Sequence, residues 1–154
     1  MDCEFIFTRD FKYISFIHDS LYSYNLSKTG GERRADVHAT ENPDSAAIIV
    51  CDKAGKCYGG AAYHWENSPR HIFVDYIFID DALRGHNIGS RLIEILETRV
   101  RGEGAENITL TTNTFQAPGF YRKMGFVETA CKAYPAKLCP ENKQYTFVKD
   151  LRKN

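Results

Sequence analysis

The sequence lacks any surplus of one charge sign and any long hydrophobic run. Lysine plus arginine and aspartate plus glutamate each number 20, so the formal net charge is zero. A nucleic-acid-binding protein usually shows a basic surplus, and a membrane helix needs roughly 20 consecutive apolar residues. The first residues, Met1-Asp2-Cys3-Glu4, also lack the basic start and apolar region of a signal peptide. We therefore expect no nucleic-acid partner, no membrane contact and a cytoplasmic location.

Closely spaced cysteine pairs are lacking as well. The chain has five cysteines, an odd number, and none of them forms a Cys-x-x-Cys motif. This pattern argues against a disulfide framework and against the common zinc motifs. Cys51 and Cys57 flank a predicted turn and could face each other across a hairpin, but cysteine usually behaves as a small buried side chain. We expect free, buried thiols, and we expect no metal site.

What the sequence does contain is enough apolar material for one core. Of its 154 residues, 43% are hydrophobic and 26% are charged, which is typical of a globular protein. There is no internal repeat, low-complexity tract or linker. Residues 1–154 are therefore expected to form a single domain.

The first half of the chain predicts a strand, a helix and three further strands. The strand is expected over 4–8 and the helix over 11–28, as one piece or two, followed by a loop over 29–45. Further strands are predicted over 46–51, 57–66 and 71–79. The turns between these three are short, which favours an antiparallel meander.

The second half changes from a period of two to the period of a helix. Residues 88–102 carry one apolar stripe, made of Ile88, Leu92, Ile93, Leu96 and Val100. A strand over 107–112, a short helix over 118–124 that begins with Pro118, and strands over 126–132 and 144–151 complete the pattern. The resulting order, β-α-β-β-β-α-β-α-β-β, predicts an α/β (α+β) domain.

Residues 84–90 lie between the third of these strands and the amphipathic helix. Backbone N–H groups in a tight loop and at a helix N-terminus point at one spot, where the helix dipole adds positive potential. Such an anion cradle usually holds a phosphate or a pyrophosphate. A single glycine-containing turn is weak evidence by itself. The residues are Arg84, Gly85, His86, Asn87, Ile88, Gly89 and Ser90.

A second segment makes the first more specific. Residues 117–126 read Ala-Pro-Gly-Phe-Tyr-Arg-Lys-Met-Gly-Phe. Together with the element order, the two segments resemble the GNAT superfamily of acyl-CoA-dependent N-acetyltransferases over roughly the whole chain. The later segment matches the family pattern Ala-x-x-Phe-Tyr-x-Lys-x-Gly-Phe fully. In the loop, Asn87 stands where the family has a glycine, and Asn adopts the left-handed conformation more readily than other side chains.

The resemblance implies a fold and a co-substrate. The fold is a mixed, mostly antiparallel sheet of six to seven strands, splayed between the fourth and fifth strands and flanked by helices. The co-substrate is acetyl-CoA, whose pantetheine arm would pair with the main chain of the fourth strand while its pyrophosphate meets the loop. The cofactor-binding residues implied are Ile77, Phe78, Ile79, Arg84, Gly85, His86, Asn87, Ile88, Gly89, Ser90, Asn113, Ala117, Phe120, Tyr121 and Lys123.

Four residues are candidates for the chemistry. By resemblance, the Tyr121 hydroxyl would donate a proton to the departing thiolate, and main-chain N–H groups would hold the oxyanion. Asp75 is a carboxylate in an otherwise apolar strand, which is costly unless it is paired or functional, and it should face the same side as Phe73. His64 and Glu66 end the preceding strand on one face and are rival candidates for the general base.

The sequence leaves the acceptor and two other functions open. The reading we favour is direct attack of a primary amine on the thioester, with a small-molecule or peptide amine as acceptor. A catalytically silent acyl-CoA-binding sensor and a nucleotide-binding α/β module are the alternatives, and the hairpin-like turns argue against the latter. A homodimer is compatible with the resemblance.

Overall fold

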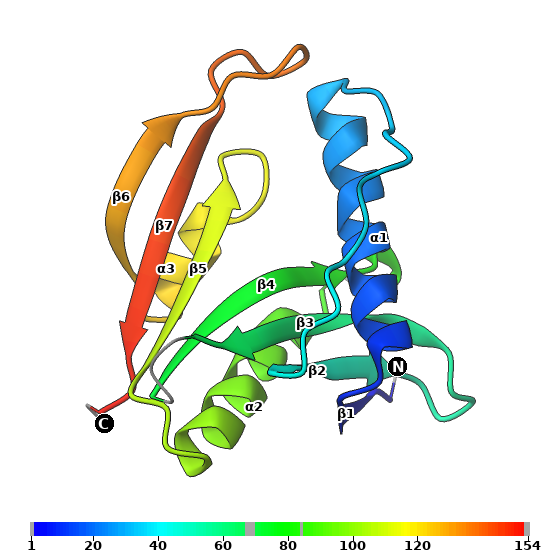
Figure 1. The fold of residues 1–154 in the computed structure, drawn as a ribbon, viewed down its shortest axis with the longest axis vertical. Coiled ribbons are helices and arrows are strands. Elements are labelled where there is room, and N and C mark those ends of the chain that lie inside the picture. Colours follow the sequence, from blue (N-terminus) through cyan, green and yellow to red (C-terminus); the bar gives the residue numbers. More distant parts are fainter. Residues whose placement is uncertain (1, 67–69, 84, 153–154) are drawn as a thin grey trace.

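The computed structural model describes residues 2–66, 70–83 and 85–152, which form a seven-stranded sheet with helices on both of its faces (Figure 1). The predicted order of elements is confirmed, with one added turn of 3-10 helix, η1. The elements are β1 (Glu4–Thr8), α1 (Phe11–Thr29), β2 (Ser45–Cys51), β3 (Cys57–Trp65), β4 (His71–Ile79), η1 (Asp81–Leu83), α2 (Ile88–Gly102), β5 (Asn107–Asn113), α3 (Pro118–Lys123), β6 (Val127–Ala133) and β7 (Lys143–Asp150).

The first helix is a single piece because both of its ends are capped. The Asp10 side chain accepts a hydrogen bond from the Lys12 N–H at the start. Gly30 adopts the left-handed conformation at the end, and its N–H donates to the Leu26 carbonyl. The predicted loop 29–45 therefore begins after Thr29. It is fixed to α1 through the Arg34 N–H, which donates to the Tyr22 hydroxyl.

The sheet has one parallel contact, and that contact is short. The strand order is β1-β2-β3-β4-β5-β7-β6, and every neighbouring pair is antiparallel except β4 and β5. These two strands pair only from His71 to Phe73 and from Asn107 to Thr109. Beyond those residues β4 stays with β3 and β5 stays with β7, so the sheet opens as a V. The predicted splay between the fourth and fifth strands is confirmed.

An extra residue in β4 accompanies the opening. Tyr63 pairs with Val74 and Ala62 pairs with Tyr76, so Asp75 has no partner in the register. Such a β-bulge bends the strand and increases its twist. It also shifts the alternation: Val74 packs in the core on the α2 side, but after the bulge it is Ile77 that does so.

Two apolar clusters hold the layers together. The larger lies between the sheet and α2 with α3, and the α2 stripe predicted from the sequence is its centre, with Leu92, Ile93, Leu96 and Val100 fully buried. The smaller cluster lies under α1, where Ile14 and Ile17 pack against β2 and β3. All five cysteines are free thiols, as expected, but only Cys51 is buried; Cys3, Cys57 and Cys139 are half-buried and Cys131 is exposed, so the expectation of burial was wrong for these four. Cys51 and Cys57 do form a register pair across the β2–β3 hairpin.

Gly60 in β3 should be intolerant of a side chain. Its φ is +155°, and a Cβ there would lie 2.3 Å from the Ile48 carbonyl oxygen. We expect Gly60→Ala to lower the free energy of unfolding by about 3 kcal/mol or more, since strain and a backbone clash add. Gly55→Ala is the matched control, because Gly55 also has positive φ but nothing within 4 Å of its Cβ. Urea denaturation should show a clearly smaller loss for the control, and equal losses would contradict the clash.

Candidate active site

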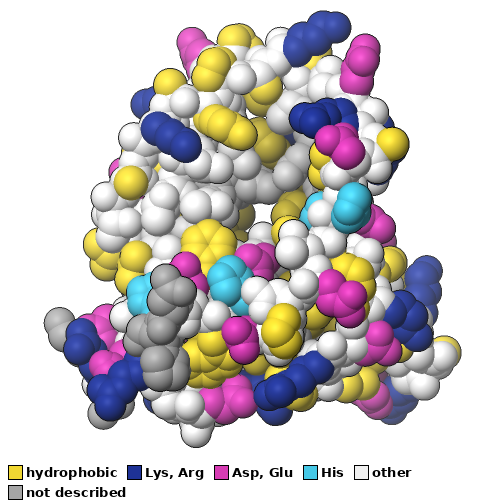
Figure 2. All heavy atoms as spheres, viewed as in Figure 1, with side chains coloured by type: hydrophobic (Ala, Val, Ile, Leu, Met, Phe, Trp, Pro, Cys, Tyr) yellow, Lys and Arg dark blue, Asp and Glu magenta, His cyan; other side chains and the backbone are white. Residues whose placement is uncertain are grey.

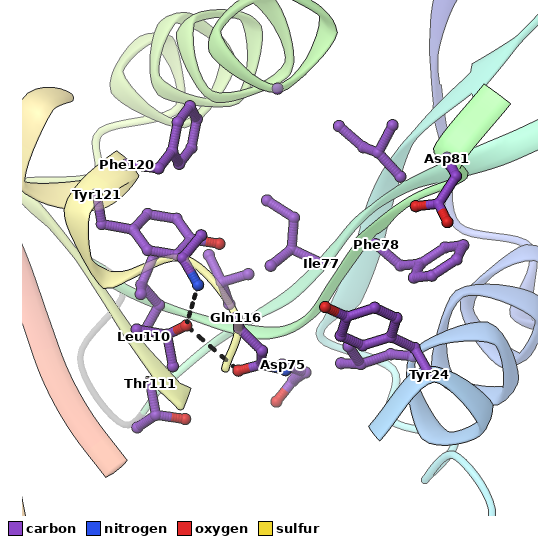
Figure 3. Close-up of a pocket in the computed structure, with 16 residues that line it drawn as sticks. Tyr24, Asp75, Ile77, Phe78, Asp81, Leu110, Thr111, Gln116, Phe120 and Tyr121 are labelled. Atoms are coloured by element: carbon purple, nitrogen blue, oxygen red, sulfur yellow. Dashed lines mark hydrogen bonds between the residues drawn. The ribbon is translucent and has the colours of Figure 1, made fainter. Parts of the chain in front are cut away.

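A cavity of about 280 Å³ fills the V between β4 and β5 (Figure 3). We call it the splay cavity. Strand β4 supplies one wall, β5 and α3 supply the other, and α1 closes one side. Its walls are mainly apolar, with carboxyl, hydroxyl and amide groups at a few points. The residues that line it include Tyr24, Asp75, Ile77, Phe78, Ile79, Gly89, Thr111, Gln116, Ala117, Phe120 and Tyr121.

The β4 wall offers main-chain groups as well as side chains. Residues Ile77, Phe78 and Ile79 line the cavity, as predicted for contacts with a pantetheine arm, and the Ile77 side chain points toward its middle (Figure 3). On this stretch β4 pairs with β3 along one edge only. Main-chain N–H and C=O groups on the other edge are therefore available to an extended ligand lying in the V.

The N-terminus of α2 reaches the same cavity. Asn87 is the N-cap residue in the left-handed conformation, with a φ of 56°, and its side chain makes no capping hydrogen bond. Gly85 before it has a φ of 83°. The first turn of α2 therefore presents main-chain N–H groups and the positive end of the dipole without a side-chain cap. His86 is exposed, Ile88 is buried in the core and Ser90 is half-buried; Arg84 lies outside the described residues.

Gly89 explains why the first turn of α2 can approach the cavity. A Cβ at this position would lie 3.4 Å from Phe120 Cζ and 3.7 Å from Ile79 Cδ1, both of which line the cavity. The added carbon would not clash with the protein. It would occupy the space that a ligand needs to reach the helix N-terminus.

Tyr121 brings a hydroxyl into the cavity from α3. Its ring is only 5% exposed and packs against Phe120, Phe126 and Phe147. The hydroxyl points across the V toward Ile77 (Figure 3). Burial raises the pKa of the Tyr121 phenol above its ordinary value, so the hydroxyl stays protonated at neutral pH and is a donor.

Asp75 and His64 form a pair at the other end of the cavity. His64 Nδ1 lies 2.7 Å from one Asp75 carboxylate oxygen and 2.9 Å from the other, and both side chains are 25% exposed. The His64 ring also packs with its centroid 5.9 Å from that of the Phe73 ring. Asp75 and Phe73 therefore lie on the same face of β4, as predicted, because His64 contacts both. Burial raises the pKa of the Asp75 carboxyl, and the hydrogen bond with His64 opposes part of that rise. Asp75 is also the bulge residue, so one feature opens the strand and places the carboxyl.

Nine described residues of the predicted site do not line the cavity: His64, Glu66, Gly85, His86, Asn87, Ile88, Ser90, Asn113 and Lys123. Glu66 sits 3.7 Å from His71 Nε2 instead of joining His64. The Asn113 side chain bonds to Gln116 and to Asn142. Lys123 is exposed on α3. Ala117 and Phe120, by contrast, lie in the cavity wall as expected.

Comparison with known proteins agrees with this geometry. The model of the "Acetyltransferase (GNAT) family" matches residues 13–126. This chain belongs to that family. A blasticidin-S acetyltransferase from Streptomyces morookaense is 33% identical over 121 residues, which cover 77% of this chain and 85% of that protein. GNAT enzymes are acyl-CoA-dependent N-acetyltransferases, and the chain is an enzyme of that class.

Solved GNAT structures share the fold. An acetyltransferase from Bacillus cereus superposes with a TM-score of 0.59 at 25% identity, covering 88% of this chain and 89% of that one. A protein from Bacillus anthracis, described as a streptothricin acetyltransferase and crystallised with acetyl coenzyme A, gives 0.60 at 18% identity over 77% of this chain and 72% of its own. The splay cavity, the open edge of β4 and the uncapped N-terminus of α2 fit acetyl-CoA as the GNAT co-substrate.

The structure adds residues that the sequence did not single out. Gln116 holds the β5–α3 turn together, and its amide Nε2 donates to Asn25 Oδ1 across the cavity at 2.9 Å. The Tyr24 hydroxyl donates to the Phe115 carbonyl at 3.4 Å. No sequence signal links α1 to this turn, because 91 residues separate each pair.

Within residues 2–66, 70–83 and 85–152, no three or more His, Cys, Asp and Glu side chains are grouped so that they could hold a metal ion. None of the helices in this described part of the chain has the length and apolarity that crossing a membrane requires.

Gly89→Ala should separate ligand binding from folding. We expect an unchanged or slightly higher melting temperature, because alanine favours a helix over glycine by about 1 kcal/mol. The added methyl group narrows the approach to the α2 N-terminus, so we expect the KM for acetyl-CoA to rise roughly tenfold, the equivalent of about 1.4 kcal/mol. Gly102→Ala, in the last turn of α2 with nothing within 4 Å, is the control and should bind acetyl-CoA normally. Similar KM values for both variants would refute the assignment.

Asp75→Asn should stabilise the fold at neutral pH. A carboxyl whose pKa is raised in the folded state favours folding when protonated and opposes it above that pKa. Asparagine keeps an acceptor for His64 but removes the buried charge. The melting temperature of the variant should exceed that of the wild type at about pH 7.5, and the difference should shrink toward about pH 4, as acid protonates the Asp75 carboxyl. A variant that is less stable at both pH values would contradict the raised pKa.

Proposed function

We propose that this GNAT enzyme moves the acetyl group of acetyl-CoA to a primary amine of a small molecule, by direct attack in a ternary complex. The observation that carries the proposal is that one cavity is lined by an open strand edge, an uncapped helix N-terminus, a protonated tyrosine and the Asp75 carboxyl, which His64 contacts from outside the lining. The name of the blasticidin-S acetyltransferase supports a small molecule as the acceptor.

The α2 end of the cavity is proposed to bind the nucleotide part of the co-substrate. Main-chain N–H groups of the first turn, around Gly89, would meet the pyrophosphate. The open edge of β4 at Ile77 and Ile79 would pair with the pantetheine amides. Acetyl-CoA supplies an activated acyl group as a thioester. A β4 N–H near Ile77 would then stabilise negative charge that develops on the acyl oxygen.

Tyr121 is proposed as the general acid. An ordinary thiol has a pKa near ~8.5 and a phenol near ~10, and burial raises the Tyr121 value further. The phenol therefore holds its proton at neutral pH and can donate a hydrogen bond to the sulfur as negative charge develops there. In the balanced step the new N–C bond forms, the C–S bond breaks and the sulfur takes the Tyr121 proton, while the surplus proton of the attacking nitrogen passes through solvent to the Tyr121 oxygen.

Asp75 and His64 are proposed to take the proton that the amine must lose. An aliphatic amine is protonated at neutral pH, so a base is needed before attack. Asp75 lines the cavity and faces the acceptor end, and His64 Nδ1 lies within hydrogen-bond reach behind it. The two side chains are therefore proposed to act as a unit, whereas Glu66 stands outside the cavity lining.

Two variants test this mechanism by release of CoA thiol with a panel of primary amines. We expect Tyr121→Phe and Asp75→Asn each to lower kcat about 10²-fold or more, within the usual range for a lost acid or base. Glu66→Gln should lose far less kcat than Asp75→Asn. Exposed Tyr134→Phe and Asp36→Asn serve as matched controls and should retain wild-type rates. Wild-type rates in both test variants would remove the proposed roles, and binding of acetyl-CoA with no turnover on any amine would favour a sensor.

A further inference from the structure

The acceptor end of the splay cavity opens on a polar face of the sheet. Asp75 and Thr111 lie at the end away from α2 in Figure 3. Thr111 is exposed, and it pairs with Thr146 of β7. Thr109 lies two residues earlier in β5 on the same face. Its hydroxyl forms a 3.0 Å hydrogen bond with His71 Nε2. This end therefore offers hydroxyl and imidazole groups to an incoming molecule.

The charged side chain that lines this end is a carboxyl. Asp75 contributes it to the lining, whereas Glu66 stands outside the lining, 3.7 Å from His71 Nε2. Among the described residues that line the cavity there is no lysine or arginine. A substrate carboxylate placed here would meet Asp75 without a cation to balance it, whereas a cationic amine would be attracted.

The cations nearest on α1 and on the loop that follows it contact aromatic rings and do not line the cavity. Lys28 is exposed and its Nζ lies 5.5 Å from the centroid of the Tyr24 ring. Arg33 is exposed, lies over the Tyr22 ring and donates to a serine of α1. Neither side chain lines the cavity.

The route to this end is framed on both sides. The hydrogen bonds from Tyr24 to Phe115 and from Gln116 to Asn25 link α1 to the β5–α3 turn above the V. Figure 2 shows the molecule hollowed here, with histidine and carboxylate side chains along the lower rim of the opening. These two contacts bound the opening on the α1 side and on the side of the β5–α3 turn.

Resting on the proposed acetyl transfer, we infer that the acceptor is a small cationic amine with no carboxylate or phosphate near the reacting nitrogen. Decarboxylated amines fit the site, and the α-amino acids that carry the same side chains do not. The preference arises from the Asp75 carboxyl at the acceptor end, which no lysine or arginine among the described lining residues balances.

Matched pairs of compounds test this inference. Tyramine and tyrosine, histamine and histidine, and agmatine and arginine differ only by the carboxylate next to the amine. Each would be assayed for CoA thiol release with acetyl-CoA, and for binding by calorimetry with CoA present. We expect kcat/KM and affinity at least about tenfold higher for the decarboxylated member of any pair that binds.

The two readouts separate the inference from the proposed function. Equal or better use of the amino acids, with thiol release intact, overturns the inference and leaves acetyl transfer standing. Selective binding of the amines with no thiol release overturns the proposed transfer and leaves the charge preference standing. Binding of neither member of any pair, with no turnover, overturns both.

A substituted threonine provides the complementary experiment. Thr111→Lys places a cation at the acceptor end and should shift the ratio of amine to amino-acid use toward the amino acid by roughly tenfold or more. Thr98→Lys is the matched control, since Thr98 is exposed on α2 and does not line the cavity. A shift no larger than that of the control would count against the inference.

Discussion

The structure depends on the point at which β4 leaves β5. The two strands share only three register pairs before each continues with its other neighbour. In an uninterrupted sheet, the main-chain N–H and C=O groups of the two strands would hydrogen-bond to one another. Here one edge of β4 lacks those partners, and the same edge forms a wall of the splay cavity. The cavity, the reach of α2 and the placement of Tyr121 all follow from that separation.

The bulge at Asp75 links the opening to the chemistry. An unpaired residue in a buried strand would ordinarily be apolar, and burial raises the pKa of this carboxyl. Its pairing with His64 compensates for only part of that burial. A group that weakens the fold at neutral pH and also faces the cavity is more easily understood as a functional residue than as a structural one.

The sequence predicted the elements well because each carried its own local signal. The α2 stripe, Pro118 at the start of α3 and the short turns around β3 are short-range features. The splay itself came from the likeness to GNAT enzymes, since no local pattern reveals where two strands cease to pair. Lys123 matches the family motif, yet its side chain is exposed at the end of the short helix α3. Sequence spacing alone does not show which way a side chain points at the end of so short a helix. His64 and Glu66 were rival candidates for the general base on one face, but in the structure His64 pairs with Asp75, the residue of the bulge. The contacts of Tyr24 and Gln116 with segments 91 residues away required the three-dimensional structure.

The bridge between α1 and the β5–α3 turn bears on how two ligands would reach one cavity. The splay cavity extends from Gly89 at the α2 N-terminus to Thr111 and Asp75. The two hydrogen bonds of the bridge hold α1 beside the turn above the V. In the proposed ternary complex, the co-substrate and the amine would approach from opposite ends, so that neither would block the other.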